Sequence, residues 1–342
     1  MKYDRRMNQT TIMEVALAAG VSLATVSRVT NHPDKVKQST REKVEKVIRE
    51  RGYVPNVNAK SLASSKSKTV AVVVPELTRS SIAGLVDGIA DCSKRRDYML
   101  RLFVNRPNSP TYISENDYWS NIMSTVVDGI LYINDELTEE NIKSIKNSLV
   151  PVVLTDTVVE DDTIPFVSID YYRAAFDMTS EMIRRGNKKI WMISANKRYV
   201  NNELKINGYS DAMKKAGLTP NIKYVSGKIQ KNEIEYAQLL SEERPDVAFV
   251  CRDSMAVSFI NVACSMGIKI PDEIQVIGFQ NTKYAELSRP TLTCIETPIY
   301  DLGERAMEIL SKMMDTDEND EIDIQTKNYV DYSVVWRDST KK

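Results

Sequence analysis

Apolar positions in residues 1–68 recur at the spacing of short helices. The first predicted helix follows Thr11, a natural N-cap, and ends at Gly20. Its apolar positions are Ile12, Val15, Ala16 and Ala19. Ser22 can cap a second helix with the sequence LATVSRVT. Two short helices separated by a glycine-containing turn predict a helix-turn-helix.

A third helix is predicted at residues 39–51, where Ser39 is the expected cap, Glu42 has the capping-box spacing and Gly52 ends the helix. Serine and lysine then dominate residues 57–69, a composition typical of a linker. The amino-terminal part is therefore predicted to be a small all-α unit followed by a connecting segment.

The pattern changes at residue 70, where short apolar runs begin to alternate with amphipathic stretches. Continuous β-branched runs are typical of parallel strands buried on both faces, and strands that alternate with helices predict doubly wound α/β units. About ten strands are more than one open sheet comfortably holds, so we expect two subdomains. The apolar runs are residues 70–74, 99–104, 129–133, 151–156, 166–170, 189–194, 246–250 and 274–279.

The predicted fold class is therefore α/β, with a small all-α helix-turn-helix head and two doubly wound parallel α/β subdomains. Ligands of such sheets bind beyond the carboxyl ends of the strands. A ligand site between two lobes follows from this architecture, which many enzymes also share.

Charge is divided unevenly along the chain. The whole sequence carries 46 Lys+Arg against 47 Asp+Glu, a net charge of −1. Residues 1–68 hold 14 basic and 6 acidic residues, which is +8, and the remainder holds 32 and 41, which is −9. A basic arm on an acidic body indicates a polyanionic partner for the first part only.

Several classes of protein are disfavoured. The single histidine, His32, lies in a turn-like stretch beside a proline, so neither a Ser-His pair nor a histidine-rich metal site is expected. The dinucleotide, P-loop and nucleophile-elbow motifs are absent, and no cofactor is predicted. No apolar run approaches the ~18 residues of a membrane helix, so no membrane partner is expected. Asp156, Asp170 and Asp253 at strand ends keep an enzyme as an alternative.

The second helix carries the strongest local signal. Residues near the amino end of a recognition helix reach base edges, and Leu23 and Ala24 offer apolar contacts suited to thymine methyls. Arg28 can bind a guanine through two hydrogen bonds. The short hydroxyls of Ser22, Thr25 and Ser27 suit phosphate contacts. The alternative is a three-helix packing unit with solvated arginine and serine.

The segment TIMEVALAAGVSLATVSRVTNHPDKVKQSTREKVEKVIRERGYVPNVNAKSLAS closely resembles the DNA-binding head of the LacI/GalR transcription regulators. VVVPEL, VDGILYI, VPVVLTD, NGYSDAMKKAGL, VIGFQNT and RPTLTCIETPIYDLGERAMEIL follow in the family's order, most similar to its catabolite-control branch. The resemblance implies a periplasmic-binding-protein-like body and a homodimer, or a tetramer, on double-stranded palindromic operator DNA. It adds Thr11, Tyr53, Asn56, Ala59, Ser61 and Leu62 to the DNA-binding residues, with Leu62 as a minor-groove wedge on a hinge helix.

The resemblance also divides the chain into four parts. They are a helix-turn-helix domain at 8–55, a hinge helix and linker at 56–68, an N-subdomain at 69–167 plus 296–324, and a C-subdomain at 168–295 plus 325–342.

The expected effector site departs from the family pattern. Arg79, Ser80 and Ser81 stand where the family has Asn-Pro-Phe-Phe-like residues, and Lys205 replaces its arginine before Gly-Phe. An Arg252-Asp253 pair replaces Asn-Asp, and Gln280 replaces an aspartate. These changes add three positive units, and Lys197 and Arg198 lie in a nearby loop. The predicted effector residues are Arg79, Ser80, Ser81, Asp170, Lys205, Arg252, Asp253 and Gln280.

Three effectors stay open at this point. The first is an anionic sugar derivative held by arginine and lysine. The second is a phosphorylated HPr protein that docks near residues 80–96 and Arg289. The third is a neutral sugar. The sequence predicts a cytoplasmic repressor of carbohydrate metabolism, not an enzyme, with no catalytic residue or metal site, and with an α/β enzyme fused to a DNA-binding head as the remote alternative.

Overall fold

The computed structural model describes residues 10–31, 33–53, 67–104, 113–134, 137–196, 199–316 and 324–341. Two compact units are present, Met1–Ser67 and Lys68–Lys342, which are called the head and the body and are described separately. His32, Lys197 and Arg198, and all the predicted hinge residues, lie outside the described residues.

The head consists of the three predicted helices, α1 (Ile12–Ala19), α2 (Leu23–Asn31) and α3 (Gln38–Arg51), with a 3-10 turn at Pro33–Lys35. Thr11 and Glu14 form a capping box at the start of α1, and Gly20 ends it at φ 58°. The axes of α1 and α2 differ by 104°, as in a helix-turn-helix. This prediction is confirmed.

The cap predicted for α3 is wrong. The helix begins at Gln38, one residue before Ser39, and Lys37 is the N-cap with no side-chain hydrogen bond. The carbonyl of Lys37 accepts hydrogen bonds from the amides of Thr40 and Arg41, so backbone contacts set the start of this helix. Gly52 ends the helix at φ 59°, as predicted.

The described part of the body contains two six-stranded sheets. Sheet A has the order β11-β5-β4-β3-β1-β2 and sheet B the order β12-β10-β9-β8-β6-β7. The strands of sheet A are β1 (Thr69–Val74), β2 (Met99–Val104), β3 (Gly129–Tyr132), β4 (Val152–Thr155), β5 (Phe166–Ser168) and β11 (Lys327–Tyr329). Those of sheet B are β6 (Ile190–Ala195), β7 (Asn221–Val225), β8 (Val247–Val250), β9 (Gln275–Gln280), β10 (Thr293–Glu296) and β12 (Ser333–Val335).

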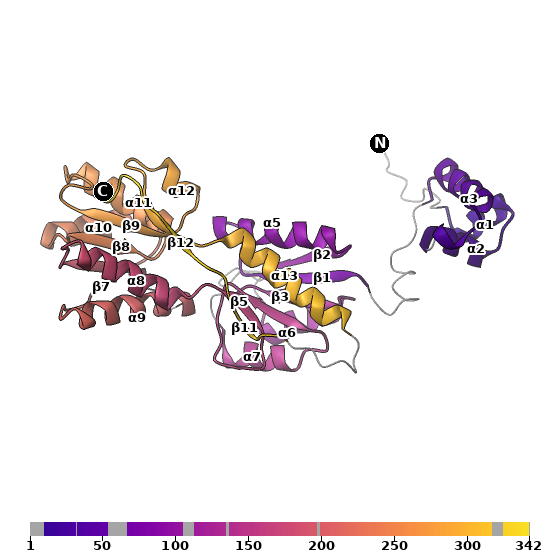
Figure 1. The fold of residues 1–342 in the computed structure, drawn as a ribbon, viewed down its shortest axis with the longest axis horizontal. Helices are drawn as coiled ribbons and strands as arrows, with labels where there is room; N and C mark the ends of the chain where they lie inside the picture. Colours follow the sequence, from indigo (N-terminus) through magenta and orange to yellow (C-terminus); the bar gives the residue numbers. More distant parts are fainter. Residues whose placement is uncertain are drawn as a thin grey trace. The chain divides into compact units, whose positions relative to one another are not determined.

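Helices cover both faces of each sheet (Figure 1). The helices on sheet A are α5 (Ser80–Arg95), α6 (Glu115–Met123), α7 (Glu139–Lys146) and α13 (Ile299–Asp315). Those on sheet B are α8 (Tyr171–Arg184), α9 (Val200–Lys215), α10 (Ile229–Glu242), α11 (Asp253–Ser265) and α12 (Lys283–Leu287). The α/β prediction with two doubly wound subdomains is confirmed.

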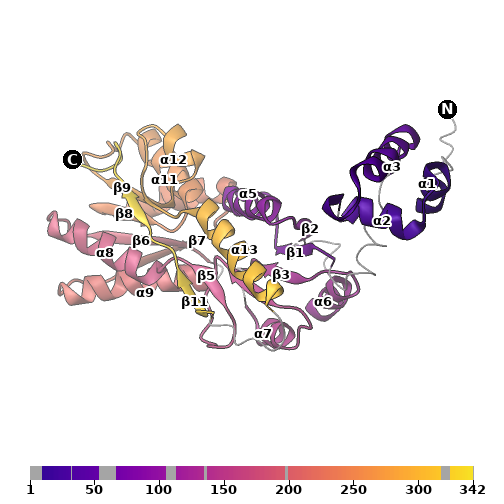
Figure 2. The ribbon, with the colours of Figure 1, turned by 45° about the vertical axis from the view of Figure 1, so that its right-hand side comes forward.

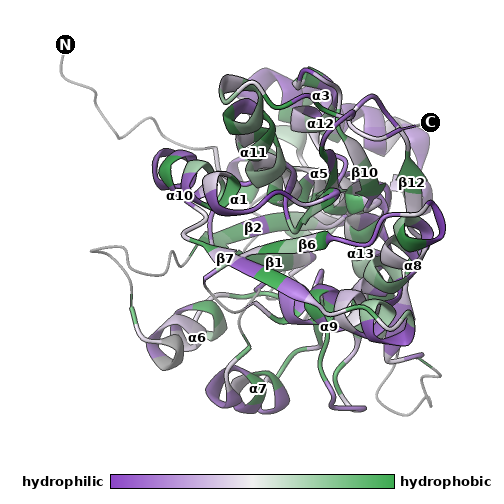
Figure 3. Cartoon of the chain, turned by 90° about the vertical axis from the view of Figure 1, so that its left-hand side faces the viewer, coloured by the Kyte–Doolittle hydropathy of each residue, from purple (hydrophilic) through white to green (hydrophobic). Residues whose placement is uncertain are grey.

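Alternate residues of each central strand enter different cores, as period-two geometry requires. On sheet A, Val70 and Val72 pack toward α5 and α13, and Ala71 and Val73 pack toward α6 and α7. Figure 2 shows α5 and α13 side by side. The helices α6, α7 and α8 each carry hydrophobic and hydrophilic residues (Figure 3), as amphipathic helices on a sheet should.

All eight predicted strands are present within one or two residues of their expected ends. The four strands that were not predicted are β7, β10, β11 and β12. Residues of β7 are mostly half-exposed, and β11 and β12 have three residues each, so they lack the continuous apolar run that identifies a buried strand.

The boundary predicted between residues 324 and 325 is wrong. Strand β11 pairs in parallel with β5 in sheet A, and β12 pairs antiparallel with β10 in sheet B. The chain therefore crosses to sheet B between Tyr329 and Ser333, a path visible as the yellow segment in Figures 1 and 2. The pairing of β11 depends on backbone hydrogen bonds, including Phe166 N to Thr326 O at 2.8 Å.

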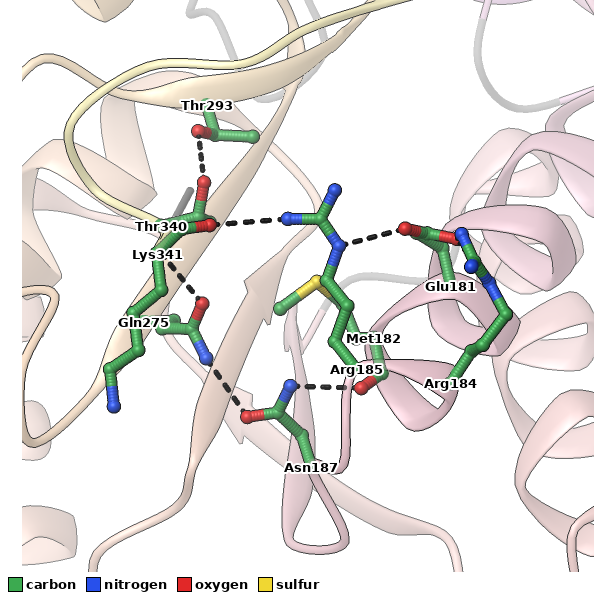
Figure 4. Close-up of polar contacts among 9 residues, drawn as sticks. All are labelled: Glu181, Met182, Arg184, Arg185, Asn187, Gln275, Thr293, Thr340 and Lys341. Carbon is green, nitrogen blue, oxygen red and sulfur yellow. Dashed lines mark hydrogen bonds and ion pairs between the residues drawn. The ribbon is translucent and has the colours of Figure 1, made fainter.

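The carboxyl-terminal tail is bound to sheet B (Figure 4). The amide of Lys341 donates to Gln275 Oε1 at 2.9 Å, and Arg185 Nη1 donates to the Lys341 carbonyl at 3.1 Å. Gln275 Nε2 donates in turn to Asn187 Oδ1 at 2.9 Å. Ser339 is completely buried beside this network. The tail is thus an integral part of the second subdomain.

Among the described residues, no single helix is long and apolar enough to cross a membrane. By length and composition alone, the bent pair α1 and α2 meets that test together. Their apolar residues Val15, Ala19, Val26 and Val29 pack into one small core with Val44 of α3.

Candidate DNA-binding head and effector site

The amino ends of α1 and α2 are fixed by hydroxyl groups of the predicted DNA-binding set. Thr11 Oγ1 accepts a hydrogen bond from the amide of Glu14 at 3.3 Å. Ser22 Oγ accepts from the amide of Thr25 at 3.2 Å and lies 2.9 Å from Thr25 Oγ1. Thr11 and Ser22 therefore cap helices, and the hydroxyls of Ser22 and Thr25 are hydrogen-bonded to each other.

The exposed face of α2 carries the residues predicted to contact bases. Val26 and Val29 point into the head's core, whereas Leu23, Ala24 and Arg28 are exposed. Leu23 has 46% of its surface exposed although it is apolar. An exposed apolar residue at the amino end of α2, one turn from an exposed arginine, is suited to a thymine methyl beside a guanine.

Arg28 differs from the basic residues of α3. Arg41 lies 2.7 Å from Glu45, and Arg49 and Lys46 also have glutamate partners one turn away. Among the described residues, no ion pair holds the guanidinium of Arg28. Three of the five basic residues of α3 thus have a glutamate partner within the helix, whereas the charge of Arg28 is available to a partner.

The remaining predicted DNA-binding residues divide into two groups. Ser27 is half-exposed on α2, and Tyr53 packs against the head's core, where burial raises the pKa of its phenol. Asn56, Ala59, Ser61 and Leu62 lie outside the described residues, so their role stays a prediction.

Four of the predicted effector residues gather at the carboxyl ends of β8 and β9 in sheet B. Lys205 of α9 is the most buried of the predicted cations, with 3% of its surface exposed. Its Nζ donates to the Cys251 carbonyl at 3.2 Å and lies 4.7 Å from the ring centroid of Tyr171 and 4.3 Å from that of Phe279. A buried ammonium group over two aromatic faces is stabilised by their quadrupoles.

Asp253 plays a different part from the one predicted. It is 1% exposed, and its Oδ2 accepts hydrogen bonds from Thr282 N at 2.6 Å and Thr282 Oγ1 at 2.9 Å. Its Oδ1 accepts from Cys294 Sγ at 3.3 Å. Because both oxygens are buried and bonded within the fold, Asp253 anchors the loop between β9 and α12 and does not present its carboxylate to a ligand.

Burial raises the pKa of Asp253 to about 6, although the hydrogen bonds from Thr282 oppose this rise. The folded protein therefore holds this proton more tightly than the unfolded chain, whose aspartate has a pKa of 3.8. We expect this residue to make the free energy of unfolding decrease as the pH rises from about 4 to about 6. Denaturant unfolding of Asp253→Asn should show a pH dependence that differs from wild type by about 3 kcal/mol across this range.

The exposed residue Asp272 provides the control, because Asp272→Asn removes a carboxylate without touching this site. If Asp253→Asn and wild type lose stability in parallel between pH 4 and pH 6, the account of a buried, raised carboxylate is wrong.

Arg252 and Gln280 complete the group in sheet B. Arg252 is the half-buried N-cap of α11, and Gln280 ends β9 with a left-handed φ of 106°. The adjacent Asn281, at φ 58°, donates from Nδ2 to Glu296 Oε1 at 2.8 Å. Two successive left-handed residues without glycine are strained, which is typical of strand ends that form ligand sites.

The other predicted effector residues lie at strand ends of sheet A. Arg79 follows β1, and its Nε lies 2.8 Å from Glu76 Oε1, so the predicted counter-charge is already balanced by a carboxylate. Ser80 begins α5, and Ser81 is buried. Asp170 follows β5, is exposed, and caps α8 by accepting from the amide of Arg173 at 2.8 Å.

The two subdomains are joined at Asp156, which follows β4. Tyr171 OH donates to Asp156 Oδ1 at 2.6 Å, and Asn201 Nδ2 of α9 donates to the Asp156 carbonyl at 2.7 Å. The carboxyl end of sheet A is thus bonded to the helices that cover sheet B. Tyr171, Asn201 and Phe279 were not among the predicted residues, although Tyr171 is an aromatic residue shortly after a strand end and Phe279 is the penultimate residue of β9.

Two surface pockets lie elsewhere in the body. One of about 700 Å³ is at the tail network of Figure 4, and its lining includes Arg185 and Asp246. The other, of about 540 Å³, lies between α13 and β11. Neither of these two pockets is lined by a predicted effector residue. No group of three or more metal-binding side chains occurs among the residues that the structure describes.

The fold and the exposed α2 define a class of protein, a regulator with a helix-turn-helix head and a periplasmic-binding-protein-like body. The profile of bacterial regulatory proteins of the lacI family matches residues 11–56, and that of the periplasmic binding protein-like domain matches residues 179–340. The chain is 36% identical to catabolite control protein A of Priestia megaterium over 336 residues, covering 97% of this chain and 99% of that protein. The chain belongs to the LacI family and is a DNA-binding transcription regulator.

Solved structures agree with this assignment. The catabolite control regulator of Lactococcus lactis is 30% identical, with a TM-score of 0.71, and the match covers 80% of this chain and 99% of that one. The lac repressor dimer bound to its operator and an anti-inducer has a TM-score of 0.86 over 97% of this chain and 99% of that one. At 21% identity this second likeness shows the shared fold alone.

Proposed function

We propose that this regulator is a homodimeric repressor of carbohydrate-metabolism genes, controlled by an anionic sugar derivative bound where the carboxyl ends of the two sheets meet. The observation that carries the proposal is the pair of cations, Lys205 and Arg252, at the carboxyl end of sheet B. The carboxylate beside them, Asp253, is hydrogen-bonded to Thr282 and Cys294 within the fold.

The aromatic residues beside the cations hold one of them in place. The rings of Tyr171 and Phe279 lie 5.8 Å apart, are buried, and lie 4.7 Å and 4.3 Å from Nζ of Lys205. The charge on Arg79 is balanced by Glu76, so we assign the counter-charges to Lys205 and Arg252 and leave Arg79 out. This revises the sequence-based hypothesis, in which all three cations bound the effector.

Calorimetric titration of the full chain tests the proposal with gluconate, glucuronate, a hexose 6-phosphate and the uncharged parent sugars. We expect at least one anion to bind and its uncharged parent to bind more weakly. Binding of a neutral sugar with no preference for the anion would contradict the proposal.

The phosphorylated HPr protein is the competing co-regulator, and the relationship to catabolite control protein A favours it. The surface predicted for it is unfavourable in charge, however. Arg95 at the end of α5 is paired with Glu304, Arg305 is paired with Glu308, and Asp301 adds an acidic group on the neighbouring α13. Arg289 donates to the carbonyls of Glu286 and Ser288. Saturable binding of phosphorylated HPr, with none by sugar anions, would decide for this alternative.

A dimer places two heads on a palindromic operator, and an exposed edge of the body supports it. Strand β2 is at the edge of sheet A, where Met99, Leu102 and Val104 are 54%, 42% and 41% exposed. An uncovered apolar edge strand favours association with another chain. Sedimentation equilibrium should show a dimer. Leu102→Lys should raise the dissociation constant of that dimer at least tenfold, because association would bury the new charge. Any tetramer should form by association of dimers. A wild-type monomer at every concentration would contradict this assembly.

We further propose that the protein acts without catalysis and in the cytoplasm, where operator DNA is found. The carboxylates that could serve an enzyme have other tasks, since Asp156 accepts from Tyr171, Asp170 caps α8 and Asp253 anchors a loop. Turnover of any sugar that binds would contradict this part of the proposal.

A further inference from the structure

Three buried hydrogen-bond donors at the carboxyl end of sheet B lack a partner among the described residues. They are Nε of Arg252, Nδ2 of Asn232 and the hydroxyl of Tyr236. Asn232 is 1% exposed and Tyr236 is completely buried. Buried polar groups are nearly always hydrogen-bonded, so three orphaned donors in one region indicate a missing acceptor.

Asn232 and Arg252 lie beside the loop between β7 and α10, and the charge of Arg252 acts on the phenol of Tyr236. Asn232 and Tyr236 are one turn apart on α10 and therefore lie on the same face. Asn232 Oδ1 accepts from Ser226 Oγ at 3.3 Å, which places the Asn232 amide beside this loop. A Cβ on Gly227, the next residue, would lie 2.9 Å from Arg252 Nη2. The guanidinium thus touches the same loop from the opposite side.

The nearby carboxylate of Glu235 accepts from none of the three donors. Its Oε2 accepts instead from the amide of Ser226 at 2.7 Å. Burial raises the pKa of Tyr236, and the nearby positive charge of Arg252 opposes that rise. The phenol is therefore neutral at physiological pH and can donate its proton in a hydrogen bond.

The pocket at the carboxyl-terminal tail gives a contrast. There, the amides of Gln275 and Asn187 and the guanidinium of Arg185 are all bonded within the protein (Figure 4). The polar groups of that pocket are hydrogen-bonded to one another, so they need no ligand as a partner. The donors of the cluster at Arg252 have no such partners in the described part of the chain.

We propose that Arg252, Asn232 and Tyr236 form the subsite that binds the oxyanion of the effector, a carboxylate or a phosphate. This inference rests on the proposed function and adds two residues of α10 that the sequence did not single out. An oxyanion accepts several hydrogen bonds at once, and bonds to a charged group are stronger than those between neutral groups. Gly227 lets the guanidinium of Arg252 lie against this loop, because a Cβ there would stand 2.9 Å from Arg252 Nη2.

The test is calorimetric titration of the full chain with gluconate, a hexose 6-phosphate and inorganic phosphate. Tyr236→Phe removes one hydroxyl and keeps the ring that packs at 5.3 Å on Phe259. We expect it to weaken binding of the anion about tenfold, the effect of one hydrogen bond to a charged group. Asn232→Asp keeps the acceptor for Ser226 but replaces a donor with a negative charge, so we expect it to abolish binding.

Tyr98→Phe is the matched control, since it removes the hydroxyl that donates to Asp315 Oδ1 at 3.0 Å in the other subdomain. It should bind the anion as wild type does. The comparison of gluconate with the phosphates shows which oxyanion the subsite takes. Far-UV circular dichroism of each variant establishes that it is folded.

The outcomes separate this inference from the function on which it rests. If wild type binds an anion and Tyr236→Phe and Asn232→Asp bind it equally well, the subsite is wrong while the anionic effector stands, and the orphaned donors are hydrated. If wild type binds no anion in the panel, the proposed effector class fails and the subsite fails with it.

Discussion

Replacing Gly88 with alanine is expected to destabilise the body by about 3 kcal/mol or more, the upper range for overpacking a core. Gly88 lies where α5 crosses α13, and a Cβ there would stand 2.1 Å from the backbone carbonyl oxygen of Tyr300. A side chain cannot relieve this clash by rotating, because the colliding atom belongs to the other helix's backbone. The helices would have to separate and expose the core between them.

Gly84, one turn earlier on α5, is a matched control. Its nearest neighbour is the side-chain atom Cγ2 of Ile299 at 3.2 Å, which can shift. Alanine also favours a helix over glycine by ~1 kcal/mol, so Gly84→Ala should leave stability within about 1 kcal/mol of wild type. Denaturant unfolding followed by circular dichroism measures both. Equal stabilities of the two variants would show that the α5–α13 crossing is not the tight contact described.

Arg28→Ala should remove most of the discrimination between operator and unrelated DNA. The loss expected for one bidentate arginine–guanine contact is about 1–3 kcal/mol in each head, or roughly fivefold to 150-fold per head, and the factors of the two heads of a dimer multiply. Arg28 is exposed on α2 opposite the buried Val26 and Val29. Fluorescence anisotropy on operator and scrambled duplexes, in the same salt, measures the ratio of the two affinities.

Arg41→Ala is the control for charge. It removes the same unit charge from α3, where Glu45 lies 2.7 Å from the guanidinium. Arg41 is not among the residues predicted to contact bases, so loss of its charge should change the affinity for both duplexes alike and leave the specificity ratio at the wild-type value. A specificity ratio unchanged in Arg28→Ala would mean that this residue does not contact a base.

The head was predictable because local signals determine it. Thr11 and Gly20 mark the ends of α1 by cap and left-handed geometry that the sequence displays directly. The start of α3 was missed, since Lys37 caps through its backbone alone, and a backbone cap has no sequence signature.

In the body, most central strands were predictable from the sequence and the short edge strands β11 and β12 were not. Long β-branched runs such as residues 70–74 identify central strands, because both faces must be apolar. Strand β11 has only three residues, and its pairing with β5 depends on the course of a chain more than 150 residues away. For that reason the crossing from sheet A to sheet B, which lies between Tyr329 and Ser333, was predicted too early, between residues 324 and 325.

The effector site illustrates a different limit. The sequence pointed to Lys205 and Arg252, and the structure brings both to the carboxyl end of sheet B. The sequence could not show that Glu76 forms an ion pair with Arg79 or that Thr282 donates hydrogen bonds to Asp253, since these contacts depend on side-chain geometry. Tyr236 and Asn232 could not be predicted for the same reason, because the sequence does not show whether a polar side chain on a helix has a hydrogen-bond partner.

The central claim is that this chain binds one DNA sequence and that an anion changes its affinity. Fluorescence anisotropy of the full protein on a palindromic operator selected from random DNA tests both parts, with and without gluconate or a hexose 6-phosphate. We expect operator affinity at least ~10³-fold above that for scrambled DNA. We also expect a change of about fivefold or more on adding the anion that binds. Equal affinity for the two duplexes, or an operator affinity that no bound anion alters, would contradict the account.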